Sequence, residues 1–148
     1  MERKGIYSLQ EVLDHVVFDR SDKKRAPRRV WCCDGDEIDM ASLRYQTFKE
    51  NGTSCAICGI DGKFFAKERH ISTSKQDGPY HFNLYALDKD GKEVIMTKDH
   101  IIARCNSGND SLKNLRTLCS PCNLNKSIED KRIKTERESK SSLSEKTK

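Results

Sequence analysis

The chain has 148 residues, the length of one compact domain with short additions at its ends. Because 34% of the residues are charged and 34% hydrophobic, the core must be modest, and small cores often depend on a disulfide or metal. No apolar run reaches membrane-spanning length, and the first ten residues lack the apolar stretch of a secretory signal, so we expect a cytoplasmic protein with no membrane partner.

Helical and extended elements are predicted in the first third of the chain. Ser8 and Glu11 fit a capping box at the start of a helix that should run from residue 8 to about residue 20. Residues 30–39 predict a short extended piece with an Asp-Gly turn, and residues 39–50 predict a second helix with an Asn-Gly stop.

A basic segment, RSDKKRAPRR, occupies residues 20–29. It carries six basic residues against one Asp, a composition that suits contacts with nucleic-acid phosphates. The alternative is a solvated linker, which charge alone does not exclude. The candidate DNA contacts in this segment are Lys23, Lys24, Arg25, Arg28 and Arg29.

The second half of the chain predicts a β-hairpin and a final helix. Residues 63–78 are polar and predict irregular loops, whereas two β-rich runs flank Asp-Lys-Asp-Gly in YHFNLYALDKDGKEVIMTKDHI, as in a hairpin. A polar loop follows, and Ser120-Pro121 predicts the start of a helix. Residues 131–148 have almost no apolar side chains and predict a disordered tail.

Two Cys-x-x-Cys pairs, Cys55 with Cys58 and Cys119 with Cys122, predict a metal site. Each pair can turn two sulfurs toward one ion, and four thiolates are typical of a closed structural zinc site. The alternatives are buried free cysteines or redox pairs. Because no feature indicates secretion, disulfides are not expected. The remaining cysteines are expected to be free thiols: Cys32, Cys33 and Cys105.

Polar residues gather around the second Cys-x-x-Cys pair. Asp99 and His100 close the hairpin, and Asn123 directly follows Cys122. A zinc ion on that pair would fix the start of the helix and hold Asn123 near the end of the hairpin. Lys126, one turn later, is a further candidate for phosphate binding. Taken singly, each of these residues could be an ordinary turn or surface residue.

The stretch TKDHIIARCNSGNDSLKNLRTLCSPCNLNK resembles the HNH endonuclease motif in its Asp-His, Asn and Cys-x-x-Cys-Asn-x-x-Lys elements. The resemblance extends from about residue 30 to residue 126, and residues 80–96 resemble phage-type members. Ala103 and Ser107 depart from the family pattern, which has a Pro and a Gly there; both affect a connecting loop.

The resemblance implies a site with one catalytic divalent ion, Mg²⁺ or Mn²⁺. His100 would be the general base and Asn114 would brace the motif by hydrogen bonds. Asp99 and Asn123 would bind the divalent ion through oxygen. A Zn²⁺ ion on the four cysteines would be structural.

The expected architecture is an α+β fold, a small ββα-metal domain stapled by the four-cysteine zinc site and preceded by short helices. The expected units are an N-terminal helix and basic linker at 1–30, a nuclease domain at 31–130 and a tail at 131–148. The expected function is metal-dependent cleavage of DNA; the alternative is a zinc-stabilised DNA-binding or assembly module without catalysis. No feature of the sequence predicts an oligomeric state.

Overall fold

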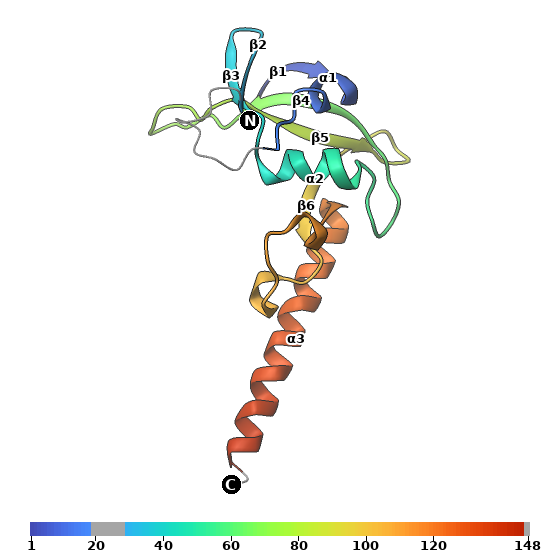
Figure 1. Ribbon diagram of the computed structural model, residues 1–148, viewed down its shortest axis with the longest axis vertical. Coiled ribbons are helices and arrows are strands. Elements are labelled where there is room, and N and C mark those ends of the chain that lie inside the picture. Colours follow the sequence, from blue (N-terminus) through green and yellow to red (C-terminus); the bar gives the residue numbers. More distant parts are fainter. Residues whose placement is uncertain (19–28, 147–148) are drawn as a thin grey trace.

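The computed structural model describes residues 1–18 and 29–146 and has mixed α+β architecture, as expected (Figure 1). The strands form an antiparallel five-stranded sheet in the order β1-β4-β5-β6-β7 and a two-stranded hairpin, β2-β3. In chain order the elements are β1 Glu2–Tyr7, α1 Leu9–Leu13, β2 Val30–Cys33, β3 Asp36–Asp39, α2 Leu43–Asn51, β4 Gly62–Arg69, β5 His81–Leu87, β6 Glu93–His100, the 3₁₀ turns η2 Arg104–Asn106 and η3 Leu112–Asn114, β7 Leu115–Cys119 and α3 Ser120–Lys146.

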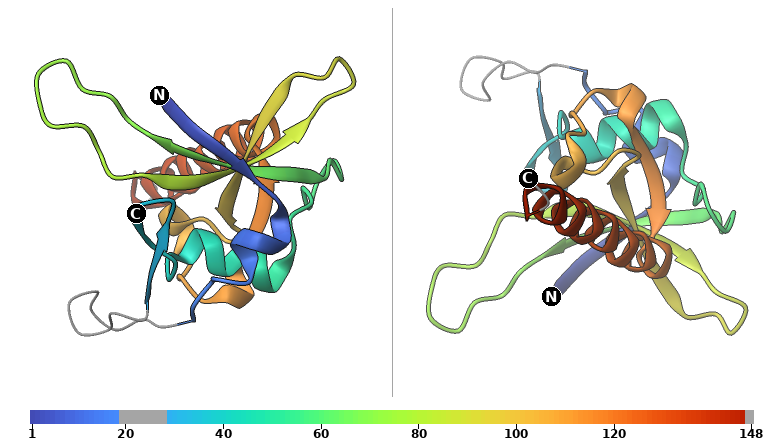
Figure 2. Two further views of the ribbon diagram at one scale, coloured as in Figure 1. Left: turned by 90° about the horizontal axis from the view of Figure 1, so that it is seen from above. Right: turned by 90° about the horizontal axis from the view of Figure 1, so that it is seen from below.

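The core lies between the sheet and the two short helices α1 and α2 (Figures 1 and 2). Aromatic rings meet there, with Phe82 against Tyr7, Tyr45 and Phe65. Burying one large apolar side chain contributes roughly 1.5–3 kcal/mol. The largest fully buried apolar side chains are Phe48, Phe65, Phe82, Ile38, Met40, Leu84, Met96, Leu115, Leu118 and Val12.

The N-terminal segment joins the main sheet, which the expected boundary at residue 30 did not foresee. β1 pairs with β4, with Ile6 opposite Ala66. The predicted capping box of Ser8 and Glu11 is confirmed, but α1 ends at Leu13 instead of reaching about residue 20. The chain leaves the helix early because the N–H of Val17 bonds to the backbone of the segment between β3 and α2.

The hairpin β2-β3 and the helix α2 follow the expected pattern. Asp34 and Gly35 form the turn with φ of 48° and 84°, the positive values that a tight hairpin turn needs. Ser42 caps α2, which therefore begins a few residues later than the predicted range 39–50, and Gly52 ends it with φ of 97°.

The prediction of irregular structure at residues 63–78 is wrong for its first half, where β4 runs in the middle of the sheet. The polar residues of this segment indicated a loop. The structure instead buries one of them, Lys67, completely within the strand. Its ammonium lies 2.5 Å from Asp36 and donates to the carbonyl of Cys33 at 2.6 Å. A buried charge is tolerated when it is paired and hydrogen-bonded in this way.

β6 connects the main sheet to the region of the candidate site. Its first residues pair with β5, from Glu93 to Ile95, and its last five pair with β7, from Met96 to His100. The strand therefore runs down from the upper sheet toward α3 in Figure 1. β7, which was not predicted as a strand, completes a unit of two strands and a helix, β6-β7-α3.

The expected disorder after residue 131 is wrong, because α3 begins at Ser120, as predicted, and continues to Lys146. No Gly or Pro follows Pro121, and Arg132 forms ion pairs one turn away in both directions, with Glu129 and Glu136. Polar composition thus coexists with a continuous helix, which projects away from the sheet (Figure 1). Among the described residues, no helix is long and apolar enough to cross a membrane.

Candidate functional site

The first Cys-x-x-Cys pair lies in a tight loop after α2 that is attached to β7. The N–H of Cys55 donates to the carbonyl of Ile60 at 2.9 Å, which closes the loop. The N–H of Ala56 donates to the carbonyl of Thr117 at 2.9 Å, which holds the loop against β7. These bonds bring Cys55 and Cys58 beside the second pair, more than sixty residues later in the chain.

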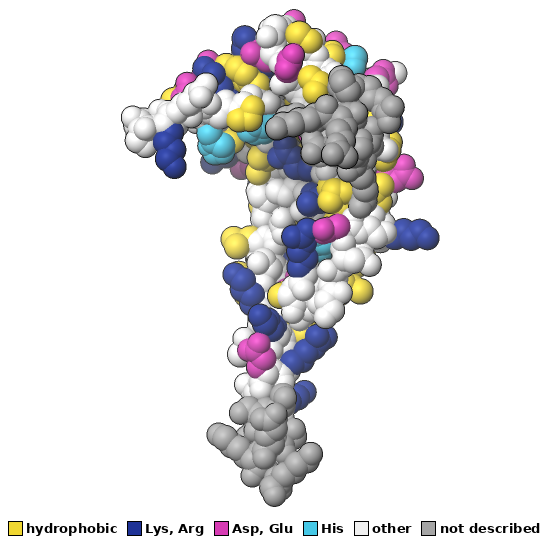
Figure 3. Space-filling view, turned by 60° about the vertical axis from the view of Figure 1, so that its left-hand side comes forward, with side chains coloured by type: hydrophobic (Ala, Val, Ile, Leu, Met, Phe, Trp, Pro, Cys, Tyr) yellow, Lys and Arg dark blue, Asp and Glu magenta, His cyan; other side chains and the backbone are white. Residues whose placement is uncertain are grey.

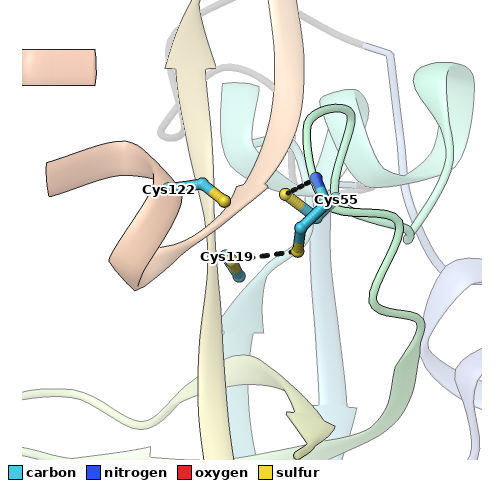
Figure 4. A group of neighbouring side chains, drawn as sticks. Cys55, Cys119 and Cys122 are labelled. Atoms are coloured by element: carbon cyan, nitrogen blue, oxygen red, sulfur yellow. Dashed lines mark hydrogen bonds between the residues drawn. The ribbon is translucent and has the colours of Figure 1, made fainter. Parts of the chain in front are cut away.

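The four cysteines form one cluster. Cys119 ends β7 and Cys122 lies in the first turn of α3, and the four sulfur atoms lie within 4.8 Å of one another. The sulfurs of Cys58 and Cys119 are 3.7 Å apart. A tetrahedral zinc ion with Zn–S bonds of about 2.3 Å has sulfurs about 3.8 Å apart. The cluster is therefore compatible with a structural metal such as zinc, and Figure 4 shows its sulfurs converging from three elements.

The thiols of this cluster differ in their tendency to ionise. Burial works against ionisation of Cys55, but backbone N–H groups, including that of Cys58 at 3.5 Å, outweigh it and lower the pKa of Cys55 to about 6. Burial and neighbouring sulfurs raise the pKa of Cys119 to about 12. Four thiolates together need a cation to compensate them. Three cysteines lie outside the cluster, as expected: Cys32, Cys33 and Cys105.

A pocket of about 260 Å³ opens beside the cluster, where β6 ends and α3 begins. Asp99 and His100 both reach it although they are consecutive, because β6 ends at His100. Asn123, which directly follows Cys122 of the four-cysteine cluster, approaches from α3. The lining residues are Lys98, Asp99, His100, Ala103, Arg104, Cys105, Asn123, Lys126, Ser127, Asp130 and Lys131.

Asn114 lies outside the pocket lining and holds the loop between β6 and β7. Its side-chain oxygen accepts from the N–H of Ile102 at 2.8 Å, and its amide nitrogen donates to the carbonyls of Ile102 and Asn109 at 3.1 and 2.8 Å. Its own carbonyl accepts from the N–H of Ile101 at 2.7 Å. Asn114 therefore fixes the backbone that directly follows His100 through hydrogen bonds to groups outside the pocket lining.

Asp99 is nearly buried and is held between two cations. Arg116 donates to it at 3.0 Å and the ammonium of Lys126 lies 3.3 Å away. Lys126 also donates to the carbonyl of His100 at 2.5 Å and to Asp130 at 2.8 Å. Lys126, expected as a phosphate contact, thus ties α3 to the end of β6 and leaves little of its ammonium exposed.

Asn123 is positioned by a hydrogen bond to the neighbouring strand. Its amide nitrogen donates to the hydroxyl of Thr97 at 2.7 Å, and that hydroxyl donates to the carbonyl of Leu118 at 2.9 Å. The amide oxygen of Asn123 has no hydrogen-bond partner among the residues that the structure describes. An amide oxygen so placed can serve as a ligand for a hard cation.

His100 is oriented by a carboxylate that sequence reasoning missed. Its Nε2 lies 2.7 Å from Asp110, which also accepts three bonds from the guanidinium of Arg104. The Arg104 guanidinium and His100 lower the pKa of Asp110 to about 2, so at neutral pH the carboxylate can only accept. Nε2 therefore carries the proton, and Nδ1 is the nitrogen of His100 that can take one.

The expected basic segment lies almost wholly outside the described residues, including Lys23, Lys24, Arg25 and Arg28. Arg29 is described, and its guanidinium pairs with Asp39 at 2.9 Å.

Sequence reasoning also missed Asp110, Arg116 and Asp130. These residues pair with His100, Asp99 and Lys126, respectively. Arg116 faces Asp99 directly across the β6-β7 ladder. This contact exists only because β6 and β7 pair. Arg116 was therefore not selected, because β7 was not predicted as a strand.

One comparison with known proteins finds a match in the region of the pocket. Residues 87–129 match the family model described as HNH endonuclease. The matched segment contains β6, β7 and the start of α3, and this part of the chain is therefore similar to the HNH endonuclease family. Comparisons with curated proteins and with solved structures found no significant match. The phage-type detail stays a prediction.

Proposed function

We propose that this protein is a metal-dependent endonuclease that hydrolyses phosphodiester bonds in DNA. The observation that carries the proposal is that Asp99, His100 and Asn123 line one pocket inside the segment that matches the HNH endonuclease family. A nuclease segment acts on nucleic acid, and the choice of DNA rests on the family resemblance.

His100 is the general base in this proposal. Nδ1 takes a proton from a water molecule while the water oxygen forms a bond to phosphorus. The bond between phosphorus and the 3′ oxygen breaks, and that oxygen leaves with the electron pair and is protonated by solvent. The products are a 3′-hydroxyl and a 5′-phosphate. Asp110 holds the imidazole ring at Nε2, and Asn114 fixes the loop that carries Asp110.

Asp99 and Asn123 are the proposed ligands of a hard divalent ion such as Mg²⁺ or Mn²⁺. The pocket offers a carboxylate and an amide oxygen, which is the donor chemistry that such ions prefer. The ion supplies charge stabilisation at the phosphate and at the leaving oxygen. Arg116 and Lys126 compensate the charge of Asp99 in the structure and keep its carboxylate in place. Zn²⁺ on the four cysteines is proposed as the structural ion that fixes the start of α3 beside Asn123.

Incubation of the purified protein with supercoiled plasmid and Mg²⁺ or Mn²⁺ tests the function. We expect nicked plasmid with either ion and none when neither ion is added, a condition that leaves the structural zinc in place. A mobility-shift assay run in parallel measures DNA binding. It distinguishes the proposed nuclease from the alternative, a zinc-stabilised binding module without catalysis. Binding without nicking in any divalent ion would support that alternative and contradict the proposed nuclease.

The basic segment at residues 20–29 is proposed to contact DNA phosphates. Replacement of Lys23, Lys24, Arg25 and Arg28 by glutamine should weaken binding to all DNA sequences. The slope of log affinity against log salt should become shallower by up to about 0.9 per lost contact. Titrations of a labelled duplex at several salt concentrations measure it, and an unchanged slope would make the segment a linker.

Asp110→Asn should reduce the nicking rate by at least about 10-fold and by up to about 10⁴-fold, the loss seen when the carboxylate that orients a general-base histidine becomes an amide. The amide oxygen can still accept a hydrogen bond from Nε2. The amide is neutral, however, and no longer stabilises the positive charge of the imidazolium that forms during proton transfer. The effect should fall on kcat, with DNA affinity unchanged, because Asp110 is proposed to act through His100. Single-turnover nicking and a binding titration without added Mg²⁺ or Mn²⁺ measure the two quantities separately.

Two matched variants control this experiment. Arg104→Gln removes the second partner of Asp110 but keeps the bond to His100, so it should retain more activity than Asp110→Asn. Asp110→Glu keeps a carboxylate and should restore part of the rate. An Asp110→Asn protein with the wild-type kcat would show that Asp110 does not orient the base.

A further inference from the structure

The side of α3 that lines the pocket continues along the helix beyond the pocket. Ser127 and Asp130 are lining residues on this side. Seven residues make two helical turns, so Lys134 lies two turns after Ser127 and Arg137 two turns after Asp130. The guanidinium of Arg137 reaches Asn106 at 3.5 Å, which places it on the side of the β6-β7 loop.

Basic side chains on this side of α3 are not neutralised. Lys131, Lys134 and Arg137 are exposed, and none of them forms an ion pair with any residue that the structure describes. We call these three residues the α3 basic track. Glu138 directly follows Arg137, lies one turn after Lys134 and marks the end of the track.

Most carboxylates of this part of α3 are turned away or already paired. Glu129 and Glu136 lie on the opposite side of the helix and bind Arg132. Asp130 is paired with Lys126 inside the pocket. The cations of this part of α3 that form no ion pair with a described residue therefore lie on the pocket side of the helix. In Figure 3, Lys and Arg side chains recur along the stem that α3 forms.

The length of the track fits an extended polyanion. With a rise of about 1.5 Å per residue, the fourteen residue steps from Asn123 to Arg137 span about 21 Å, or roughly six base pairs of duplex DNA. A duplex with one phosphate at the pocket can therefore bring phosphates on one flank alongside the track. α3 projects away from the sheet in Figure 1, so no described strand covers this part of the helix.

We infer that the α3 basic track binds the phosphate backbone of the DNA on one flank of the scissile bond. The inference rests on the proposed function, which puts the scissile phosphate in the pocket, and extends it to a contact surface that the HNH segment at residues 87–129 does not contain. Such contacts position the duplex without reading its sequence.

The test compares two full-length variants with the same change in charge. The first is Lys131→Gln with Lys134→Gln and Arg137→Gln; glutamine favours helices about as well as the residues it replaces. The control is Lys49→Gln with Lys89→Gln and Lys92→Gln, which are exposed residues on α2 and in the β5-β6 turn. Binding to a 30-base-pair duplex is titrated without added Mg²⁺ or Mn²⁺ across a range of salt concentrations, so that no cleavage takes place and the structural zinc is retained.

We expect the track variant to lose affinity and its salt slope to become shallower by up to about 0.9 for each lost contact, while the control keeps nearly the wild-type slope. Equal slopes in the two variants, or no DNA binding by the wild-type protein, would overturn the inference. Circular dichroism checks that α3 remains helical. If the salt slope of the track variant becomes shallower but the wild-type protein never nicks plasmid, the track is supported and the proposed nuclease activity is contradicted. If the wild-type protein nicks plasmid but the slope of the track variant is unchanged, the nuclease activity is supported and the track is contradicted.

Discussion

His100→Ala should lower the rate of plasmid nicking by about 10²–10⁴-fold, the usual loss when a general base is removed. The change touches no cysteine of the cluster and neither proposed ligand of the catalytic ion. Zinc content, melting temperature and DNA affinity should therefore stay near the wild-type values. Nicking of supercoiled plasmid under single-turnover conditions measures the rate, and metal analysis and thermal melting measure the rest.

A histidine outside the pocket provides the matched control. His70 is exposed at the end of β4, and His70→Ala should nick at the wild-type rate. Asp99→Ala should also abolish nicking, but through the lost divalent ion, and excess Mn²⁺ should restore part of its activity. If His100→Ala matched His70→Ala in rate, His100 would not be the base.

Cys119→Ala should abolish cooperative folding instead of slowing catalysis alone. Structural zinc contributes about 10–16 kcal/mol of apparent binding free energy in zinc-finger peptides, comparable with the whole stability of a small domain, about 5–15 kcal/mol. Cys119 joins β7 to α3 and packs in the core, so its loss also releases the helix that carries Asn123. Zinc per chain and the thermal unfolding transition measure the effect.

The exposed Cys32 provides the control for that substitution. It lies on β2, outside the four-cysteine cluster, and Cys32→Ala should keep about one zinc per chain and the wild-type transition. A Cys119→Ala protein that unfolds cooperatively at the wild-type temperature would contradict a structural role for the cluster.

Local sequence patterns predicted the parts of the site that depend on short-range geometry. The spacing of two Cys-x-x-Cys pairs predicted the cluster, and Ser120-Pro121 predicted the start of α3. The end of the strand at His100 explains why Asp99 and His100 share a pocket. Each of these features is specified by a few neighbouring residues.

Features that depend on contacts between distant segments were not predicted. β4 looked like a loop because its Lys67 is charged, and only the pairing with Asp36 across the fold makes a strand possible there. Arg116 meets Asp99 only through the register of β6 and β7. Asp110 reaches His100 only through the path of a loop held by Asn114. In each case a polar residue acquires its partner from tertiary structure.

The chemistry of the cut ends tests most directly whether the pocket hydrolyses DNA. Plasmid nicked by the wild-type protein in Mg²⁺ is purified and treated with DNA ligase. Attack by a water that His100 activates, with the 3′ oxygen as leaving group, predicts 3′-hydroxyl and 5′-phosphate ends, so the ligase should reseal the nicks. Nicks that the ligase cannot seal, or plasmid that stays intact while the protein binds it, would contradict the proposed reaction.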